Sequence, residues 1–509
     1  MGNNAKNVIE FIYAGIMLSA EQSDFSFARY SHAWGRKGTQ EHNDKFLSFV
    51  QDLRRLAKDC GVSYYEGDYY HFNGKYYEVV SIDMIRAAYD QFLEHYHIVA
   101  VMSNDKVFKH YFLETARYYN ELHIRNDLVA FSNGVLDLEN FSFGNFSKDY
   151  HITRCHPFRY DPKAQCNKWN AFLHEVLPDK KDRAILQMFM GLGLIQRGNI
   201  YGEFNEKANA KVELCLILIG SGANGKSVIY QTMMGIFGAS RISSVDYDEL
   251  TASGDEGMRA RRLLRNAVFN WSSDSNGKTF GKKRSGVFKR IVSGEPVLDR
   301  RLGENISQNY NMPYLIFNLN EIPVPDDTTH GFIRRLQFVS FDVTIPPERQ
   351  NRKLASELIS EYPAIFNWIV RGAMEIRRRR FMFPKSDGNA RKNLLVNLKI
   401  NPVSTWIKVY GIEKEPTKYS EKPIECNSEM LEHWVGLFCE ENGEEVPSRK
   451  KIGFELSKNG FKRKHTSAGN IYYIYGITEA ELTIPINIEK EVFDVDYKED
   501  KNTYINFDD

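Results

Sequence analysis

The chain has 509 residues, of which 42% are hydrophobic and 26% are charged. This length predicts about three domains, and the composition excludes a mostly disordered or collagen-like chain. Lysine and arginine (67) balance aspartate and glutamate (66), giving a formal charge of +1. Any nucleic-acid site must therefore be a local patch rather than a field over the whole molecule.

No apolar run approaches the roughly 20 residues that a membrane-spanning helix needs, so we expect a soluble protein with no membrane partner. Residues 11–18 favour an amphipathic helix over a signal-peptide core, because Glu10 borders them. The six cysteines are scattered and form no CxxC pattern, and HExxH is absent. We therefore expect neither a zinc site nor a disulfide framework, and a cytoplasmic location follows as the default.

The first 115 residues are predicted to form a mixed, mainly helical domain. Apolar residues recur at helical spacing over 43–59, and two aromatic runs flank Asn73 and Gly74 within 64–80. These patterns predict a helix, then a β-hairpin, then a second helix from about Ile82.

After about residue 205 the pattern changes to buried strands. Four apolar runs of strand length occupy residues 214–219, 267–271, 314–319 and 336–341. Runs that are apolar on both faces are typical of a parallel sheet covered by helices, so we expect an α/β fold. Residues 352–380 have a helical pattern, and residues 384–388 have the composition of a linker. We expect a smaller domain over residues 385–480 and an acidic tail over residues 481–509.

A phosphate-binding loop is the sharpest signal in the sequence. Residues 220–227 read GSGANGKS and lie between an apolar run and a helical segment. In such a loop, glycines let backbone amides surround phosphates, the lysine reaches the β and γ phosphates, and the hydroxyl ligates Mg²⁺. We expect ATP and Mg²⁺ as cofactors, held by Gly220, Gly222, Asn224, Gly225, Lys226 and Ser227.

The loop and its surroundings resemble superfamily 3 helicases of the phage, plasmid and poxvirus primase-helicase type, over residues 120–345. Upstream, residues 132–138, 153–154, 160–162 and 169–173 are similar to the helical segment that precedes the motor in that family. The resemblance implies a helical segment over residues 116–205, an AAA+-like P-loop motor over residues 206–384, and a winged-helix-like domain over residues 385–480.

The resemblance also assigns catalytic residues. Asp274 follows the second apolar run, where it would hold Mg²⁺ together with Ser227, and Asn320 follows the third run as the residue that senses the γ-phosphate. No second acid adjoins Asp274, so the group that orients the attacking water is open: Asp274 itself or a residue brought in by folding. Arg335 is the expected arginine finger of a neighbouring subunit, with Arg334 as the alternative.

Two basic segments are candidate DNA contacts. Lys289, Arg290, Arg300 and Arg301 flank a Gly-Glu-Pro turn and resemble the segment with the DNA-contacting hairpin of the ring channel. Lys462, Arg463 and Lys464 precede an aromatic strand, which is the outline of a winged helix. The alternatives are a solvated charged surface for the first segment and a small packing domain for the second.

The first interpretation is a ring-forming, hexameric, ATP-driven 3′–5′ helicase for replication of a phage, plasmid or mobile element. Its partners would be further copies of the chain, single-stranded DNA in the channel, duplex origin DNA and a separate primase. The alternatives are a bifunctional primase-helicase, an origin-binding initiator, or a DNA-binding assembly platform without catalysis. The first 110 residues lack a persuasive group of acids for primase chemistry.

Overall fold

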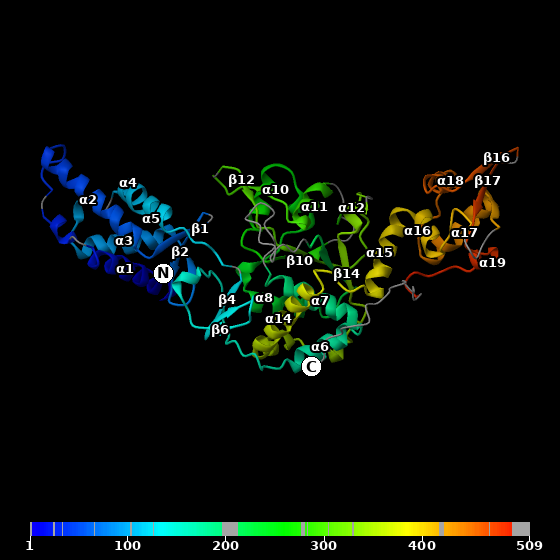
Figure 1. Ribbon diagram of the computed structural model, residues 1–509, viewed down its shortest axis with the longest axis horizontal. Coiled ribbons are helices and arrows are strands. Elements are labelled where there is room, and N and C mark those ends of the chain that lie inside the picture. Colours follow the sequence, from blue (N-terminus) through cyan, green and yellow to red (C-terminus); the bar gives the residue numbers. More distant parts are fainter. Residues whose placement is uncertain are drawn as a thin grey trace. The chain divides into compact units, whose positions relative to one another are not determined.

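The computed structural model describes residues 3–490, apart from 24–25, 33, 66, 102–103, 126, 196–211, 276–279, 282–283, 304, 328–329, 417–421 and 468. The chain divides into two compact units, residues 1–161 and residues 162–509 (Figure 1). Within the described ranges, no helix is long and apolar enough to cross a membrane.

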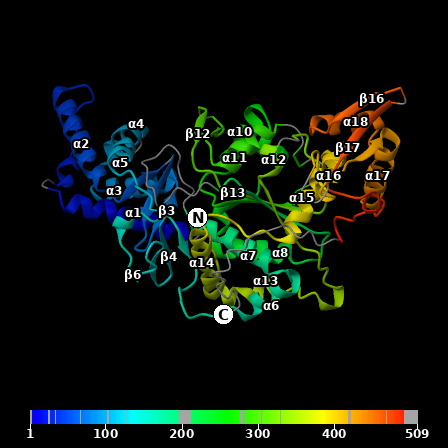
Figure 2. The same ribbon diagram turned by 45° about the vertical axis from the view of Figure 1, so that its right-hand side comes forward.

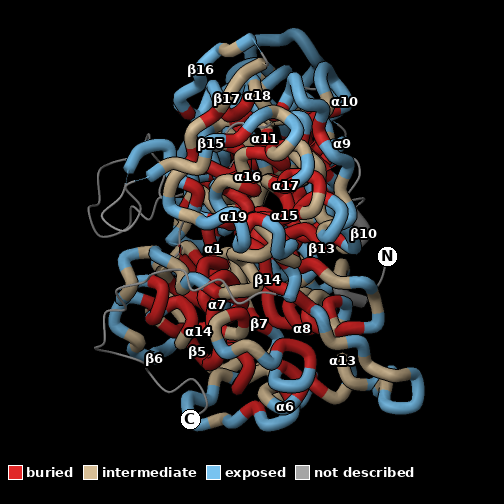
Figure 3. Tube along the Cα trace, turned by 90° about the vertical axis from the view of Figure 1, so that its right-hand side faces the viewer, coloured by how far each residue is buried: buried red, intermediate tan, exposed pale blue. Residues whose placement is uncertain are grey.

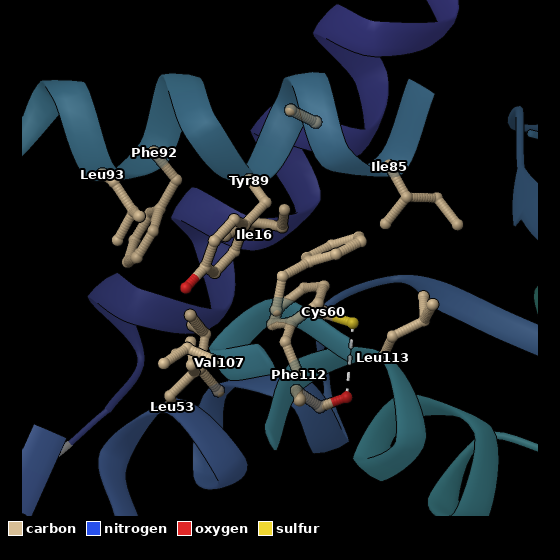
Figure 4. Close-up of a cluster of buried hydrophobic side chains, with 14 of the residues drawn as sticks. Ile16, Leu53, Cys60, Ile85, Tyr89, Phe92, Leu93, Val107, Phe112 and Leu113 are labelled. Carbon is tan, nitrogen blue, oxygen red and sulfur yellow. Dashed lines mark hydrogen bonds between the residues drawn. The ribbon is translucent and has the colours of Figure 1, made fainter. Parts of the chain in front are cut away.

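The first unit is built on a helical core. Its main helices are α1 (Asn3–Glu21), α2 (Gln40–Lys58), α3 (Ile82–His95) and α5 (Glu114–Tyr119), and α5 continues the π-helix η3 (Phe108–Leu113). Side chains from all the longer helices meet in one cluster, in which Ile16, Leu53, Tyr89 and Phe112 are fully buried (Figure 4). The predicted amphipathic helix near the start and the helices at 43–59 and from Ile82 are confirmed.

Two small sheets complete the first unit. Strands β1 (Val62–Tyr65), β2 (Asp68–Phe72) and β3 (Tyr77–Val80) are antiparallel, and the predicted Asn73-Gly74 turn joins β2 to β3. A four-stranded sheet follows in the order β6-β5-β4-β7, with β4 at Leu128–Phe131, β5 at Gly134–Asp137, β6 at Phe143–Gly144 and β7 at Cys155–His156.

This second sheet corrects the helical segment expected over residues 116–205. Phe131 pairs with Gly134 across a two-residue turn, so residues 128–137 form a hairpin. Leu128, Ala130 and Val135 are buried together with Ile152, which is the alternation of a strand rather than the spacing of a helix. Among the described residues of this segment, the end of α5 is helical, and the longer helices are α6 (Asn167–Val176) and α7 (Lys180–Leu192), which both belong to the second unit. Residues 196–205 of the expected segment lie outside the described residues.

A five-stranded parallel sheet is the centre of the second unit. Its strands are β8 (Cys215–Ile219), β9 (Ile242–Ser243), β10 (Phe269–Ser275), β13 (Tyr314–Leu319) and β14 (Leu336–Ser340), in the order β14-β8-β13-β10-β9. Every pairing in it is parallel. The four apolar runs of the sequence are four of these strands, so the predicted parallel α/β sheet is confirmed. The two-residue β9 was not predicted.

Helices cover both faces of this sheet (Figures 2 and 3). On one face lie α7, α8 (Lys226–Phe237) and α14 (Tyr362–Arg378), with Phe189 of α7 and Phe237 of α8 against Phe269. On the other face, α9 (Tyr247–Thr251) and α11 (Ser285–Ser293) share a core with the strands. Helices α7 and α14 touch closely, because a Cβ on Gly191 would lie 2.2 Å from the amide nitrogen of Ala373.

The segment expected to be a linker instead packs on the motor. Ser386 is buried and caps α15 (Asp387–Ile400), whose Val396 belongs to the core of the sheet. The edge strand β14 has its outer amides taken by side chains. Asn389 accepts from the Phe338 amide at 2.8 Å, and Asp182 accepts from the Ser340 amide at 3.4 Å.

The C-terminal elements run helix, strand, helix, helix and hairpin. They are α16 (Pro402–Val409), β15 (Ile424–Asn427), α17 (Ser428–Glu441), α18 (Arg449–Lys458), β16 (Arg463–Thr466) and β17 (Gly469–Ile474), and the sheet order is β15-β17-β16. A short helix, α19 (Glu479–Leu482), follows.

The tail expected from residue 481 begins later. Ile488 is fully buried, and the Tyr410 hydroxyl donates to the Ile484 carbonyl at 2.8 Å, so the first ten residues of the expected tail pack on this domain. Residues 491–509, which carry most of the acids, lie outside the described residues.

Candidate functional site

The phosphate loop joins β8 to α8 and is held in shape by its neighbours. The Asn224 amide donates to the Phe341 carbonyl at 3.3 Å, and the Ile345 amide donates to the Ala223 carbonyl at 2.9 Å. A Cβ on Gly220 would lie 2.5 Å from that same Phe341 carbonyl oxygen. Gly225 has a φ of +85° and touches Phe172 of α6, so a side chain there would be strained as well as crowded. The chain after β14 and helix α6 therefore fix the loop.

The loop offers backbone donors to an anion. Within the described part of the chain, the amides of residues 222–227 donate to no backbone or side-chain acceptor. They lie at the N-terminus of α8, where the helix dipole is positive. Nothing lies within 4 Å of a Cβ placed on Gly222, so the space beside the loop is open. Such a group of amides can hold an anion such as a phosphate.

Lys226 is the buried cation of the loop. It is the first residue of α8, and its Nζ donates to the Gly220 carbonyl at 2.6 Å. Burial lowers the pKa of this amine to about 8. Ser227 follows and is exposed, with its hydroxyl on the first turn of the helix. A hydroxyl here and a carboxylate at the same sheet edge are oxygen ligands that suit Mg²⁺.

Sheet order brings two other predicted residues to this edge. Because the sheet is parallel, β8, β13 and β10 all end at the same side, and β13 lies between the other two. Asn320 directly follows β13 and is exposed, next to the loop that follows β8. Asp274 lies near the end of β10, where the register slips between Ser272 and Ser275. The Asp274 side chain itself is outside what the structure describes.

One acid near this edge was missed by the sequence reasoning. Asp246 follows β9 and accepts a hydrogen bond from the Ser272 hydroxyl of β10. Asp246 and Glu249 form a capping box at the start of α9. The spacing Asp-x-x-Glu before an apolar residue could have identified this cap.

The arginine pair lies at the opposite end of the strands from the phosphate loop. Arg335 precedes β14, and its carbonyl accepts from the Cys215 amide at the start of β8. Strand β8 has five residues at about 3.3 Å each, so roughly 16 Å separates the start of the strand, where the arginines lie, from the phosphate loop at its end. Neither arginine reaches the loop of its own chain.

The two arginines differ in burial and in hydrogen-bond partners. Arg335 is buried and donates to the Gly331 carbonyl, to the Ser293 hydroxyl at 2.9 Å and to Glu213 at 3.2 Å. Its guanidinium is therefore held by groups of its own chain. Arg334 is half-exposed, and its one described partner is the same Glu213 carboxylate, at 3.1 Å. Glu213 was not singled out from the sequence, where it is a lone acid before a strand.

The first basic segment is largely ion-paired. Lys289 and Arg290 lie on α11, and Arg300 and Arg301 lie in the loop between β11 (Val297–Asp299) and β12 (Ser307–Asn309). At the end of β11, Asp299 forms a buried ion pair with Arg265 at 2.6 Å. Lys289 pairs with Asp327 at 2.7 Å, and Arg300 pairs with Asp255 at 2.8 Å. Lys289 and Arg300 are therefore paired with acids of their own chain, and Arg290 and Arg301 are exposed.

The second basic segment is a surface strand. Lys462, Arg463 and Lys464 are all exposed, at or just before β16, which is the outer strand of its sheet. Helix α18 packs beside this sheet, since a Cβ on Gly453 would lie 2.5 Å from the Tyr472 hydroxyl. On the outer side of α18, Phe454 is 65% exposed.

Comparison with known proteins gives two family matches. Residues 53–178 match the family described as D5 N terminal like, and residues 218–335 match a family of unknown function, DUF5906. The second match spans the phosphate loop, Asp274, Asn320 and both arginines.

Two viral relatives are named as helicases. "Putative helicase 121R" of Invertebrate iridescent virus 3 is 26% identical over 234 residues, or 42% of this chain, and "Putative helicase L207/L206" of Acanthamoeba polyphaga mimivirus is 24% identical over 236 residues, or 44%. The aligned part covers 22% of each relative, so the chain spans about a fifth of the length of these proteins.

Among solved structures, the apo C-terminal region of NrS-1 covers 83% of this chain and 98% of its own length, at 11% identity and a TM-score of 0.41. The D5 N-terminal match and the two relatives named as helicases bear out the resemblance to superfamily 3 helicases of the primase-helicase type that was seen in the motifs.

Proposed function

We propose that this chain is the ATP-driven motor of a replicative DNA helicase. The observation that carries the proposal is the shared sheet edge, where the open amides of the phosphate loop, buried Lys226, Asn320 and the end of β10 come together. Phosphoryl transfer needs positioning and charge stabilisation more than covalent chemistry. This edge supplies both.

In this proposal each residue has one task. The loop amides and Lys226 hold the β and γ phosphates, and Asn320 contacts the γ-phosphate from the strand between the loop and Asp274. Ser227 and Asp274 would hold Mg²⁺, which when bound neutralises the charge that develops on the phosphate oxygens. The acid that orients water stays open between Asp274 and a residue added by folding.

A ring completes the active site. The arginines lie about 16 Å from the loop of their own chain along strands of five residues, so a finger must act on a neighbouring copy. We propose Arg334 for this role and a hexameric ring as the assembly, because Arg335 is buried and bonded within its own chain.

DNA would be held by two elements of the second unit. The exposed Arg290 and Arg301 suit a strand in the ring channel, moving 3′–5′ as ATP is hydrolysed. The C-terminal elements follow the order of a winged helix, with α18 as the helix that meets DNA and β16 as part of the wing. Exposed Phe454 and the basic residues of β16 support duplex binding there.

ATP turnover with and without single-stranded DNA tests the proposal. The chain is expected to hydrolyse ATP, faster with DNA, and Lys226→Ala is expected to abolish turnover. Lys148→Ala changes an exposed lysine in the other unit and is the matched control. Absence of turnover in the wild-type chain, with nucleotide binding retained, would instead support an assembly platform.

A further inference from the structure

An unusual surface lies on the first unit, where the ends of α2 and α5 meet β1. We call it the aromatic-basic face. Its residues are Arg54 and Lys58 of α2, Tyr64 of β1, Tyr111 of η3, and Arg117, Tyr118 and Tyr119 of α5.

Cations and rings alternate across the aromatic-basic face. The Arg54 guanidinium lies 5.0 Å from the Tyr111 ring, the Lys58 amine 4.2 Å from the Tyr119 ring, and the Arg117 guanidinium 4.5 Å from the Tyr64 ring. Such contacts occur about once per 70–80 residues in proteins. Five such contacts lie within the described part of residues 54–119, which exceeds that frequency, and three of the five belong to the aromatic-basic face.

The backbone holds this surface rigidly. The Asn120 side chain donates to the Ala57 carbonyl at 3.1 Å, which ties the end of α5 to the end of α2. The Tyr64 amide donates to the Asn120 carbonyl, and the Leu122 amide to the Tyr64 carbonyl, both at 2.9 Å, which ties α5 to β1. The preceding turn is the π-helix η3, a rare form that often marks functional positions.

Two rings on this surface are offered to solvent. Tyr118 is 79% exposed and Tyr119 is 53% exposed, and their centroids lie 5.0 Å apart at 77°. Neither ring belongs to the core of the unit, to which Phe108, Phe112 and Ala116 of η3 and α5 contribute. Exposed aromatic rings beside lysine and arginine suit a ligand with flat apolar faces and a regular negative charge.

We propose that the aromatic-basic face binds single-stranded DNA, with bases stacked on Tyr118 and Tyr119 and phosphates beside Arg54, Lys58 and Arg117. A duplex keeps its bases stacked on each other, so the exposed rings favour a single strand. The choice of DNA over RNA rests on the proposed helicase function. The site itself lies in residues 1–161 and uses no residue of the motor.

Binding of a fluorescent oligo-dT to the full chain without nucleotide tests how much the tyrosines and the basic residues contribute to affinity. Replacing Tyr118 and Tyr119 together by Ala is expected to weaken binding by at least about tenfold, while replacing both by Phe keeps the rings and the affinity. Phe11→Ala, which removes a ring of similar exposure on α1, is the control and should change nothing. Replacing Lys58 and Arg117 by Gln should lower the salt slope by about 0.7 per charge. Affinity and slope unchanged in all variants would overturn the proposal.

Cross-linking locates the site independently of the motor. With iodouracil-substituted single-stranded DNA, irradiation should label the tryptic peptide 118–125, which holds both tyrosines. The same label is expected in the Lys226→Ala chain, so a failed helicase function leaves this result intact. Labels confined to other peptides would show that the strand binds elsewhere. Stronger labelling of this peptide by a matched oligo-U would overturn the assignment to DNA.

Discussion

The pKa of Lys226 predicts how nucleotide affinity changes with pH. Burial lowers this pKa to about 8, and the amine donates to a carbonyl of its own loop. Bound phosphates favour the charged amine, so they raise its pKa, and nucleotide binding above pH 8 must take up a proton. Affinity is therefore expected to fall as the pH rises through 8.

The size of the effect follows from the pKa. An amine with a pKa of about 8 is roughly nine-tenths charged at pH 7 and one-tenth charged at pH 9. If the charged form alone binds, affinity falls about tenfold over this range, or about 1.4 kcal/mol. The phosphates do not contribute, because their second pKa is about 6.

Equilibrium binding of a fluorescent ADP with Mg²⁺, measured at half-unit steps from pH 7 to pH 9, gives the profile. Lys226→Arg is the matched control, because a guanidinium stays charged over the whole range. Its affinity is expected to be independent of pH, whatever its absolute value. A flat wild-type profile, or an equal slope in Lys226→Arg, would refute the idea that this amine titrates at the phosphates.

Arg334→Ala is expected to abolish ATP turnover without changing the melting temperature. When this variant is mixed with Lys226→Ala chains, part of the ATP turnover is expected to return, because some subunit interfaces then join an intact arginine to an intact phosphate loop. Arg335→Ala is expected to lower the melting temperature by several degrees, since its partners are left buried; equal melting temperatures for the two variants would contradict the assignment. Burial raises the pKa of Asp182 to about 7, above its ordinary 3.8, so the folded chain binds a proton at this carboxyl more tightly than the unfolded chain. The free energy of unfolding is therefore expected to fall as the pH rises from about 4 to 7, by up to about 1.4 kcal/mol per pH unit. Asp182→Asn should remove that part of the slope in denaturant titrations at each pH. Gly191→Ala should cost about 2 kcal/mol or more because the added carbon meets backbone of α14, while Gly286→Ala, with open space around it, should cost nothing.

Local sequence patterns were enough to predict the motor sheet. Residues 214–219 and 314–319 are apolar on both faces, and a parallel sheet buried under helices is where such runs occur. The phosphate loop was readable because its glycines and lysine have fixed spacing. The residues that hold the loop in shape could not be predicted. Phe341 and Phe172 lie far from the loop in sequence, and no local pattern indicates that the carbonyl of one and the ring of the other pack against it.

Two features that the sequence did not reveal have a common physical cause. Adjacent Arg334 and Arg335 look alike in sequence, and only the position of Ser293 and Glu213 in the fold decides which one is buried. The expected linker at 384–388 has the composition of a loop, but Ser386 begins a helix that two cores share. Long-range contacts decided both cases, and they leave no periodic trace in the sequence.

The edge strand β14 limits how another strand could pair with this sheet. An open edge of a sheet is a template on which another strand can pair. Here Asn389 and Asp182 occupy the amides of Phe338 and Ser340 that would receive such a strand. These two amides are therefore not available for backbone pairing with another strand at the β14 edge. Capping of an edge strand by side chains of the same chain is also a protection against edge-to-edge aggregation.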